Sequence, residues 1–165
     1  MEYRKSYQRH SAKLAPTGYE WFMGTVTEIK DGDTICFSAD RRVHVLRLLG
    51  VDSPEMGKKD AKNEFYSRAC VQFLADLVLK KPVRALLTVE PVMARKKLGY
   101  LFVPGDEVSV NERMVAAGYA FASRSFSFPE QAHYLGLEIA AREKRIGMWK
   151  EPPRLSPGLG ALLEQ

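Results

Sequence analysis

Residues 21–38, which read WFMGTVTEIKDGDTICFS, contain the pattern that decides the fold. The first half is rich in aromatic and β-branched residues, which favours a strand over residues 21–29. The polar residues 30–33, KDGD, are a strong turn signal, and the apolar residues 34–38 after them predict a second strand. The stretch therefore predicts a β-hairpin with acidic residues at its tip.

A third strand is predicted over residues 43–51, after a turn at 39–42. Arg47 interrupts its apolar pattern, and a buried guanidinium without a partner would be costly, so we expect a carboxylate or phosphate beside it, or an opening at that point. Both faces of the strand are expected to be covered, as in a closed barrel, because apolar residues occupy both sides: Val43, Val45, Leu49 and Val51 on one side, Leu46 and Leu48 on the other.

Five further elements follow from periodicity and from breakers: a helix over 60–80, strands over 83–89 and 98–103, and helices over 111–117 and 129–146. The first helix carries two adjacent apolar stripes at i, i+4 spacing, which predict a wide core-facing surface: Phe65, Ala69, Phe73 and Leu77, and Tyr66, Cys70, Leu74 and Val78. The chain should therefore have five strands and three helices.

Length and composition indicate one domain, because 165 residues with 45% apolar content support a single core. We expect an N-terminal arm over residues 1–20, the domain over 21–150 and a tail over 151–165. Residues 1–10 lack the apolar stretch of a signal peptide, and no apolar run reaches membrane-spanning length. The chain as given is thus expected to be cytoplasmic, or secreted if it is a trimmed mature form, with no membrane partner and as a monomer.

Charge favours a polyanionic partner, although many basic proteins bind no nucleic acid. Lys and Arg number 25 against 20 Asp and Glu, a formal charge of +5. The two cysteines, Cys36 and Cys70, lie in apolar stretches and are expected to be buried thiols without a disulfide. Two Cys and three scattered His do not fit a zinc site, so any metal should have oxygen ligands.

Two acidic segments, residues 31–34 (DGDT) and 52–55 (DSPE), lie at the ends of strands separated by one hairpin, so their carboxylates can converge. Oxygen ligands of this kind suit a hard cation such as Ca²⁺. An EF-hand is excluded, because Ile35, Cys36 and Arg42 occupy positions where its loop needs other residues. Two simpler interpretations stay open: a surface turn at DGD, and an arginine at position 47 paired with a neighbouring acid.

Four segments resemble the staphylococcal nuclease (thermonuclease) family in order and spacing: GTVTEIKDGDTICF (24–37), VLRLLGVDSPE (45–55), VNERMVAAGYA (110–120) and AAREKRIGMW (140–149). The resemblance covers roughly residues 22–149. It is specific, because DGDT, RLxGVDxPE and the final GxW occur together. It implies an α+β, mainly β fold, a five-stranded OB-fold barrel with three helices, and nucleic acid, DNA or RNA, as substrate.

The resemblance also implies roles for individual residues. Calcium would be held by Asp33, Asp52 and the backbone carbonyl of Ser53, with Asp31 behind them. Glu55 would remove or orient a proton of the attacking water, and Arg47 would neutralise charge in the transition state. Products with 3′ phosphates are expected.

The chain departs from the family at two places. The family usually has a second catalytic arginine before its fifth strand, and here Lys96 occupies that position, with Arg95 one residue earlier and Lys97 one later. These residues are candidates for the second catalytic cation and for substrate binding, or form a solvated basic loop that helps to hold phosphates. Two positions that are usually tyrosines near the substrate are Arg124 and Phe126, which we also expect to contact it.

Three functions are compatible with these features. An active calcium nuclease is favoured, because a binding module has little reason to retain mutually repelling carboxylates beside a phosphate site. A nucleic-acid-binding OB module whose chemistry has decayed is the alternative, supported by the altered 95–97 segment. A protein-interaction module that uses the barrel as a scaffold is the third.

Overall fold

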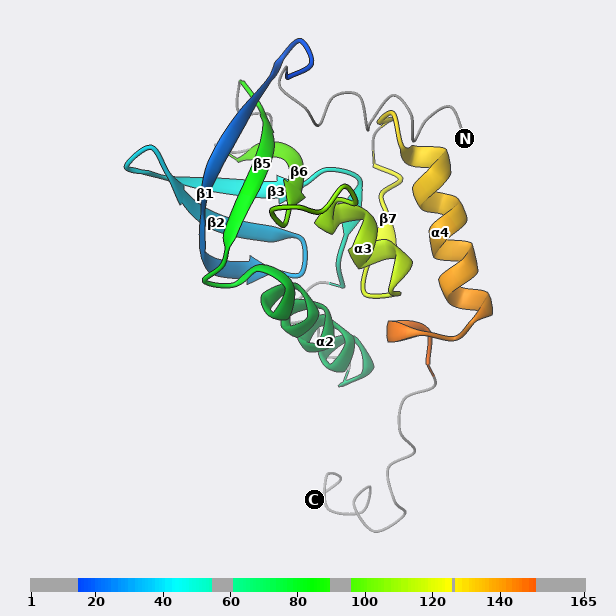
Figure 1. The fold of residues 1–165 in the computed structure, drawn as a ribbon. Coiled ribbons are helices and arrows are strands. Elements are labelled where there is room, and N and C mark those ends of the chain that lie inside the picture. Colours follow the sequence, from blue (N-terminus) through cyan, green and yellow to red (C-terminus); the bar gives the residue numbers. More distant parts are fainter. Residues whose placement is uncertain (1–14, 55–60, 90–95, 126, 151–165) are drawn as a thin grey trace, which may run out of the picture.

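The computed structural model describes residues 15–54, 61–89, 96–125 and 127–150, and the fold within them is a closed barrel flanked by helices (Figure 1). The barrel order is β1-β2-β3-β6-β5. Its strands are β1 (Tyr19–Asp31), β2 (Thr34–Ala39), β3 (Arg42–Leu48), β5 (Pro82–Thr88) and β6 (Lys97–Phe102). All neighbours are antiparallel except β3 and β6, whose parallel pairing closes the barrel.

Three α-helices accompany the barrel in the described residues: α2 (Ala61–Val78), α3 (Val110–Ala116) and α4 (Gln131–Glu143), followed by a short 3₁₀ turn, η1 (Gly147–Trp149). Figure 1 shows α2 beneath the barrel, and α3 between the barrel and α4. The expected OB-fold, a five-stranded barrel with three helices, is therefore confirmed. No helix in the described ranges is long and apolar enough to cross a membrane.

The third predicted strand is shorter than expected. β3 ends at Leu48, and Gly50 has a φ of +77°, a conformation that glycine adopts without steric cost. The chain then enters β4 (Val51–Asp52), which pairs with β7 (Phe121–Ala122) in a separate two-stranded sheet. The sequence pattern did not reveal this break, because apolar residues continue on both sides of Gly50.

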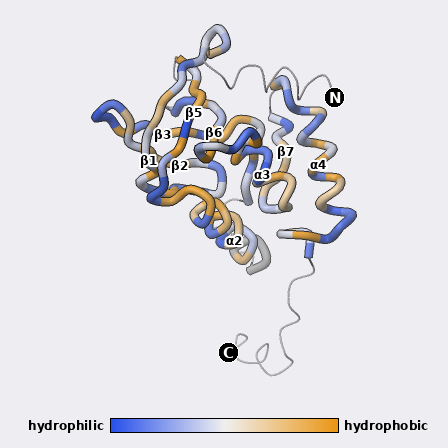
Figure 2. The backbone as a smooth tube through the Cα atoms, viewed as in Figure 1, coloured by the Kyte–Doolittle hydropathy of each residue, from blue (hydrophilic) through white to orange (hydrophobic). Residues whose placement is uncertain are grey.

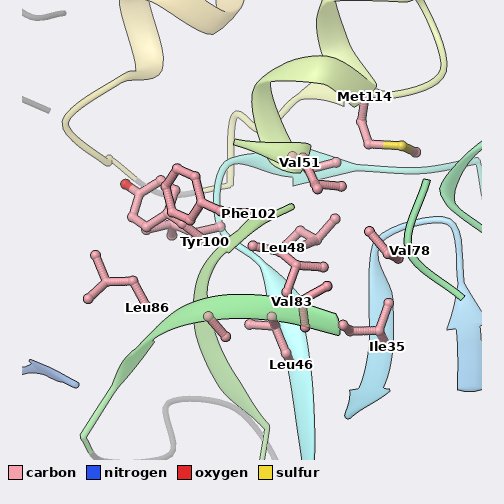
Figure 3. Packing of buried hydrophobic residues seen from close by; sticks show 14 of the residues in the cluster. Ile35, Leu46, Leu48, Val51, Val78, Val83, Leu86, Tyr100, Phe102 and Met114 are labelled. Carbon is pink, nitrogen blue, oxygen red and sulfur yellow. The ribbon is translucent and has the colours of Figure 1, made fainter. Parts of the chain in front are cut away.

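The barrel interior is apolar and well filled. Figure 3 shows Ile35, Leu46, Leu48 and Val83 pointing into the same space, and each of these side chains is at most 1% exposed. Figure 2 shows hydrophobic residues along β5, β6 and α2, whereas the hairpin tip between β2 and β3 is hydrophilic. Truncation of a side chain such as Leu48 to alanine should cost about 2–5 kcal/mol of stability.

Two expectations about burial were wrong in part. Val43 is 66% exposed, so the side of β3 that carries Val43 and Arg47 is not fully covered. On α2 the stripe from Tyr66 to Val78 is buried, but Phe65 in the neighbouring stripe is 49% exposed. Burial of Cys36 and Cys70 as free thiols is confirmed.

Buried Asn111 holds α3 against the barrel next to the break in β3. Its side-chain amide donates to the carbonyls of Leu49 and Gly99, at 2.9 Å each, and its Oδ1 accepts from the N–H of Leu101 at 3.1 Å. These bonds pair the buried side-chain amide of Asn111 with backbone groups of the core. Residues 1–14 and 151–165 lie outside the described residues, so the arm and the tail stay predictions; β1 begins at Tyr19, two residues before the expected start of the domain.

Candidate active site

A polar pocket of about 470 Å³ lies where the β1–β2 turn meets the end of β3 and β4. Three aspartates and two cations face it, together with hydroxyl groups. Its described lining residues are Asp31, Asp33, Thr34, Arg47, Asp52, Ser53, Lys96 and Ser125. The structure therefore brings together residues from both acidic segments, as their spacing predicts.

Asp33 is the most enclosed acid of the pocket, and only 8% of the residue is exposed. Its Oδ1 accepts the hydroxyl of Thr34 at 2.8 Å. Its Oδ2 accepts both the N–H and the hydroxyl of Ser53, at 3.0 and 2.9 Å. These bonds connect the β1–β2 turn to the segment after β4, so the two acidic segments are fixed relative to each other.

Arg47 lies between two aspartates. Because Arg47 is the register partner of Thr34, its side chain starts beside the acidic turn. Its Nη1 lies 2.7 Å from Asp33 Oδ2, and its Nη2 lies 2.6 Å from Asp52 Oδ1. Nη1 also donates to the carbonyl of Val51 at 2.9 Å. The sequence left open whether Arg47 has a carboxylate partner or lies at an opening. The structure shows both, because Arg47 contacts two carboxylates and lines the pocket.

Asp31 lies at the end of β1 with its carboxylate near the other charges of the pocket. Its Oδ1 accepts the N–H of Gly32 at 2.8 Å. Burial and the neighbouring charge of Asp33 raise the pKa of Asp31, and the Gly32 N–H, Arg47 and Lys96 oppose this rise. Burial is the largest of these influences, and it holds the pKa of Asp31 above its ordinary value.

The turn between the acids packs closely against two other segments. A Cβ added to Gly32 would lie 2.7 Å from the Cβ of Ser53 and 3.0 Å from the Cβ of Cys70. Glycine is therefore required here by close packing. Burial raises the pKa of the Cys70 thiol to about 12, so it stays protonated behind the pocket.

The two described lysines of the basic segment point in different directions, as neighbouring residues on a strand do. Lys96 lines the pocket and acts electrostatically on Asp31. The Nζ of Lys97 lies 5.3 Å from the centre of the Phe22 ring, and its charge lowers the pKa of His44, although less than burial does. Only Lys96 of the two is at the pocket, and substrate binding by Lys97 stays a prediction.

Arg124 is held next to the pocket by a buried acid. Its Nη1 lies 3.2 Å from Oε2 of Glu138, a side chain that is only 1% exposed. The neighbouring Ser125 lines the pocket. A role of Arg124 in substrate binding stays a prediction, as do the roles of Glu55, Arg95 and Phe126, which lie outside the described residues.

Sequence reasoning missed two lining residues and one supporting acid. Thr34 was visible as the last residue of the DGDT motif, and Ser125 lies between the two positions where the family has tyrosines. Glu138 lies in line with buried Tyr134 and Ala141 on α4. An acidic residue in the apolar stripe of a helix is the signal that could have identified it.

The donor groups of the pocket fit a hard cation by type, because carboxylate, hydroxyl and carbonyl oxygens are the ligands that calcium prefers. In the part of the chain that the structure describes, no group of three or more His, Cys, Asp or Glu side chains is gathered as a metal site. Arg47 is the charge that Asp33 and Asp52 share in this arrangement.

Comparison with known proteins matches residues 45–151 to the family model described as staphylococcal nuclease homologue. A micrococcal nuclease of Shigella flexneri is 34% identical over 143 residues, which cover 82% of this chain and 78% of the relative. Protein ParB of Escherichia coli is 32% identical, covering 87% and 81% of the two chains. A thermonuclease of Staphylococcus intermedius is 30% identical, covering 76% and 74%.

Proposed function

The chain belongs to the staphylococcal nuclease family, and from this membership we propose that it is a calcium-dependent nuclease that hydrolyses phosphodiester bonds of DNA, RNA or both. The observation that carries the proposal is the meeting of Asp33, Asp52 and Arg47 at one open pocket. Cleavage of a phosphodiester can use two kinds of charged group. Acidic groups bind a cation, and a guanidinium binds the phosphate.

In this proposal, Arg47 binds the phosphate that is attacked. Its planar N–H groups match phosphate oxygens as well as they match the carboxylates that it now contacts. Negative charge increases on the phosphate oxygens in the five-coordinate transition state, so a fixed guanidinium lowers the barrier. Lys96, on the same pocket, would supply a second positive charge without the bidentate geometry of arginine.

Asp33, Asp52 and the carbonyl of Ser53 would hold calcium, with Asp31 behind them. A bound calcium ion would polarise a phosphoryl oxygen and add positive charge beside the phosphate. Glu55, three residues after Asp52, would accept or orient a proton of the attacking water. The family resemblance leads us to expect products with 3′ phosphates.

A direct test is to incubate the protein with plasmid DNA and with RNA in calcium, in magnesium and in EDTA. We expect cleavage in calcium and none in EDTA. Glu55→Gln should lower turnover by about 10²- to 10⁴-fold, because the proton acceptor is lost. Asp76→Asn is the matched control, since Asp76 is an exposed acid on α2 whose carboxylate accepts from Gln72, a neighbour on the same helix.

A second candidate is a binding module that no longer cuts, and the lysine at position 96 is the observation that favours it. Loss of one transition-state donor can cost on the order of 10²-fold in rate. Binding to both nucleic acids without cleavage in every condition would decide for this module and against the nuclease.

A further inference from the structure

Glu138 on α4 is a charged side chain buried outside the pocket, at 1% exposure. Its Oε2 accepts the backbone N–H of Ala122 at 2.8 Å. Its Oε1 accepts from Nη2 of Arg142 at 2.5 Å, and Arg124 donates to both of its oxygens at 3.2 and 3.3 Å. Burial alone raises the pKa of Glu138, but the Arg124, Ala122 and Arg142 bonds together hold that pKa below its ordinary value.

The backbone group that Glu138 holds belongs to the short β7–β4 sheet. Ala122 is the partner of Val51 in that sheet, and Phe121 is the partner of Asp52. The N–H of Ser123 continues the connection by donating to the carbonyl of Gly50 at 2.9 Å. Two strands of two residues each are too short to be stable alone, so their position depends on what anchors them.

Both residues of β4 contact Arg47. The carbonyl of Val51 accepts Nη1 of Arg47, and the carboxylate of Asp52 accepts Nη2. Hydrogen bonds and strand pairing therefore connect Glu138 through β7 and β4 to Arg47. A shift of β7 would move together the two acceptors that β4 offers to the guanidinium, whereas its third partner, Asp33, lies on the β1–β2 turn.

We propose that Glu138 is a positioning residue of the active site, which sets the place of Asp52 and the direction of Arg47 through the β7–β4 sheet. The expected effect on kcat rests on the proposed nuclease function. The expected effect on the position of Arg47 does not depend on that function. Arg124 and Arg142 compensate the buried charge, and Glu138 Oε2 anchors β7 through the Ala122 N–H.

The test compares Glu138→Gln and Glu138→Ala with matched substitutions of Glu130. Glu130 is a suitable control, because it is a buried acid at the N-cap of the same helix. Its carboxylate accepts from the hydroxyl of Tyr100 of β6, which does not line the pocket. All assays are run well below the unfolding temperature of each variant, so that every protein is fully folded. The thermal midpoint of each variant is measured first.

We expect Glu138→Ala to lower kcat by about 10- to 100-fold with KM nearly unchanged, because displacement of a positioned catalytic group can cost on the order of 10²-fold. Glu138→Gln retains an oxygen that can accept the Ala122 N–H, so its loss should be smaller. Glu130→Ala should keep kcat within about twofold, since among the described residues its carboxylate bonds to Tyr100, which does not line the pocket. A combination of Glu138→Ala with Asp52→Asn should lose less than the product of the single effects, because both act on Arg47.

A second readout does not depend on cleavage. The ¹⁵N and ¹H resonances of the Arg47 guanidinium should shift in Glu138→Gln and in Glu138→Ala, and should stay in place in Glu130→Gln. Unchanged Arg47 resonances with wild-type kcat in the Glu138 variants would overturn the inference, as would equal losses of kcat in the Glu138 and Glu130 variants. If the unmodified protein cuts nothing, the proposed function fails, and the Arg47 resonances still decide the role of Glu138.

Discussion

Arg47 is paired with two aspartates in the same pocket that we propose for the phosphate. Each carboxylate contacts a different Nη atom, so the two N–H donors that point at them are occupied. A phosphate must then exchange with, or share, these partners to reach the guanidinium. A cation bound by the two aspartates would free Arg47 for the phosphate, so we expect a nucleotide bisphosphate to bind more tightly when calcium is present. Calorimetry with and without calcium measures this difference in affinity.

The neighbouring lysines allow a matched comparison at the residue scale. Lys96→Ala should reduce cleavage on the order of 10²-fold, because it removes a cation that lines the pocket. Lys97→Ala should reduce it far less, since that side chain lies over Phe22. Initial rates on a short oligonucleotide measure both, and equal losses would place Lys97 at the substrate after all.

Gly32 allows a second test at this scale. Gly32→Ala places a Cβ against Ser53 and Cys70 and should destabilise the fold by about 1–3 kcal/mol, the usual cost of overpacking. Gly136→Ala is the control, because nothing lies within 4 Å of a Cβ at that helical position. It should add about 0.5–1 kcal/mol of stability. Urea unfolding measures both, and a neutral Gly32→Ala would contradict the close approach.

At the scale of elements, α4 and its N-cap carry two buried acids, Glu138 and Glu130, whose pKa values are shifted in opposite directions. Burial raises the pKa of Glu130, although the hydroxyl of Tyr100 opposes the rise. At Glu138 the bonds from Arg124, Ala122 and Arg142 outweigh the effect of burial. The environment of each acid, and not its residue type, decides which form the folded protein prefers.

These directions predict opposite pH dependences of stability. The pKa of Glu138 is below the ordinary 4.5 in the folded state, so its contribution is present above pH 4.5 and is lost as pH falls through the folded pKa. The pKa of Glu130 is raised, so its contribution is present below pH 4.5 and is lost as pH rises through the folded pKa.

Urea midpoints of the wild type, Glu138→Gln and Glu130→Gln measured across acid pH check both signs. The loss of stability of Glu138→Gln relative to the wild type should become smaller as pH falls. Glu130→Gln should become more stable relative to the wild type as pH rises. Parallel curves for all three proteins would contradict the shifts.

Much of the element order could be read from the sequence, because strand and helix periodicities were strong. The β1–β2 hairpin, the closed barrel and α2 follow from alternation, from the KDGD turn and from i, i+4 stripes. The break at Gly50 and the β4–β7 sheet could not be predicted, since two-residue strands leave no periodic signal and depend on contacts between distant segments.

The candidate site was predictable to a similar degree. Asp31, Asp33, Arg47 and Asp52 meet as expected, because short turns fix their positions relative to the strands. Which of Lys96 and Lys97 faces the pocket could be decided only from the register of β6. The contacts of Glu138 could be identified only from the packing of α4. Both depend on tertiary structure, which single-sequence patterns do not carry.

For the whole molecule, the two cysteines report on cooperativity. Cys36 lies in β2 and Cys70 in α2, and both are buried free thiols with raised pKa values. Their thiols should resist a water-soluble disulfide reagent until the protein unfolds, because the thiolate is the reactive form. In Cys36→Ala and Cys70→Ala the remaining thiol should become reactive at the unfolding midpoint of that variant. Reaction of Cys70 well before unfolding would show that α2 separates from the barrel independently.

The parallel pairing of β3 with β6 has a consequence for synthesis on the ribosome. Leu46 of β3 meets Lys97 of β6, so α2 and β5 must both be translated before the barrel can close. A nascent chain that already contains Asp33, Arg47 and Asp52 therefore lacks the wall that carries Lys96 and, later still, Ser125. The pocket can therefore take its final shape only after Ser125 has been translated, so a shorter nascent chain cannot present the complete set of lining residues.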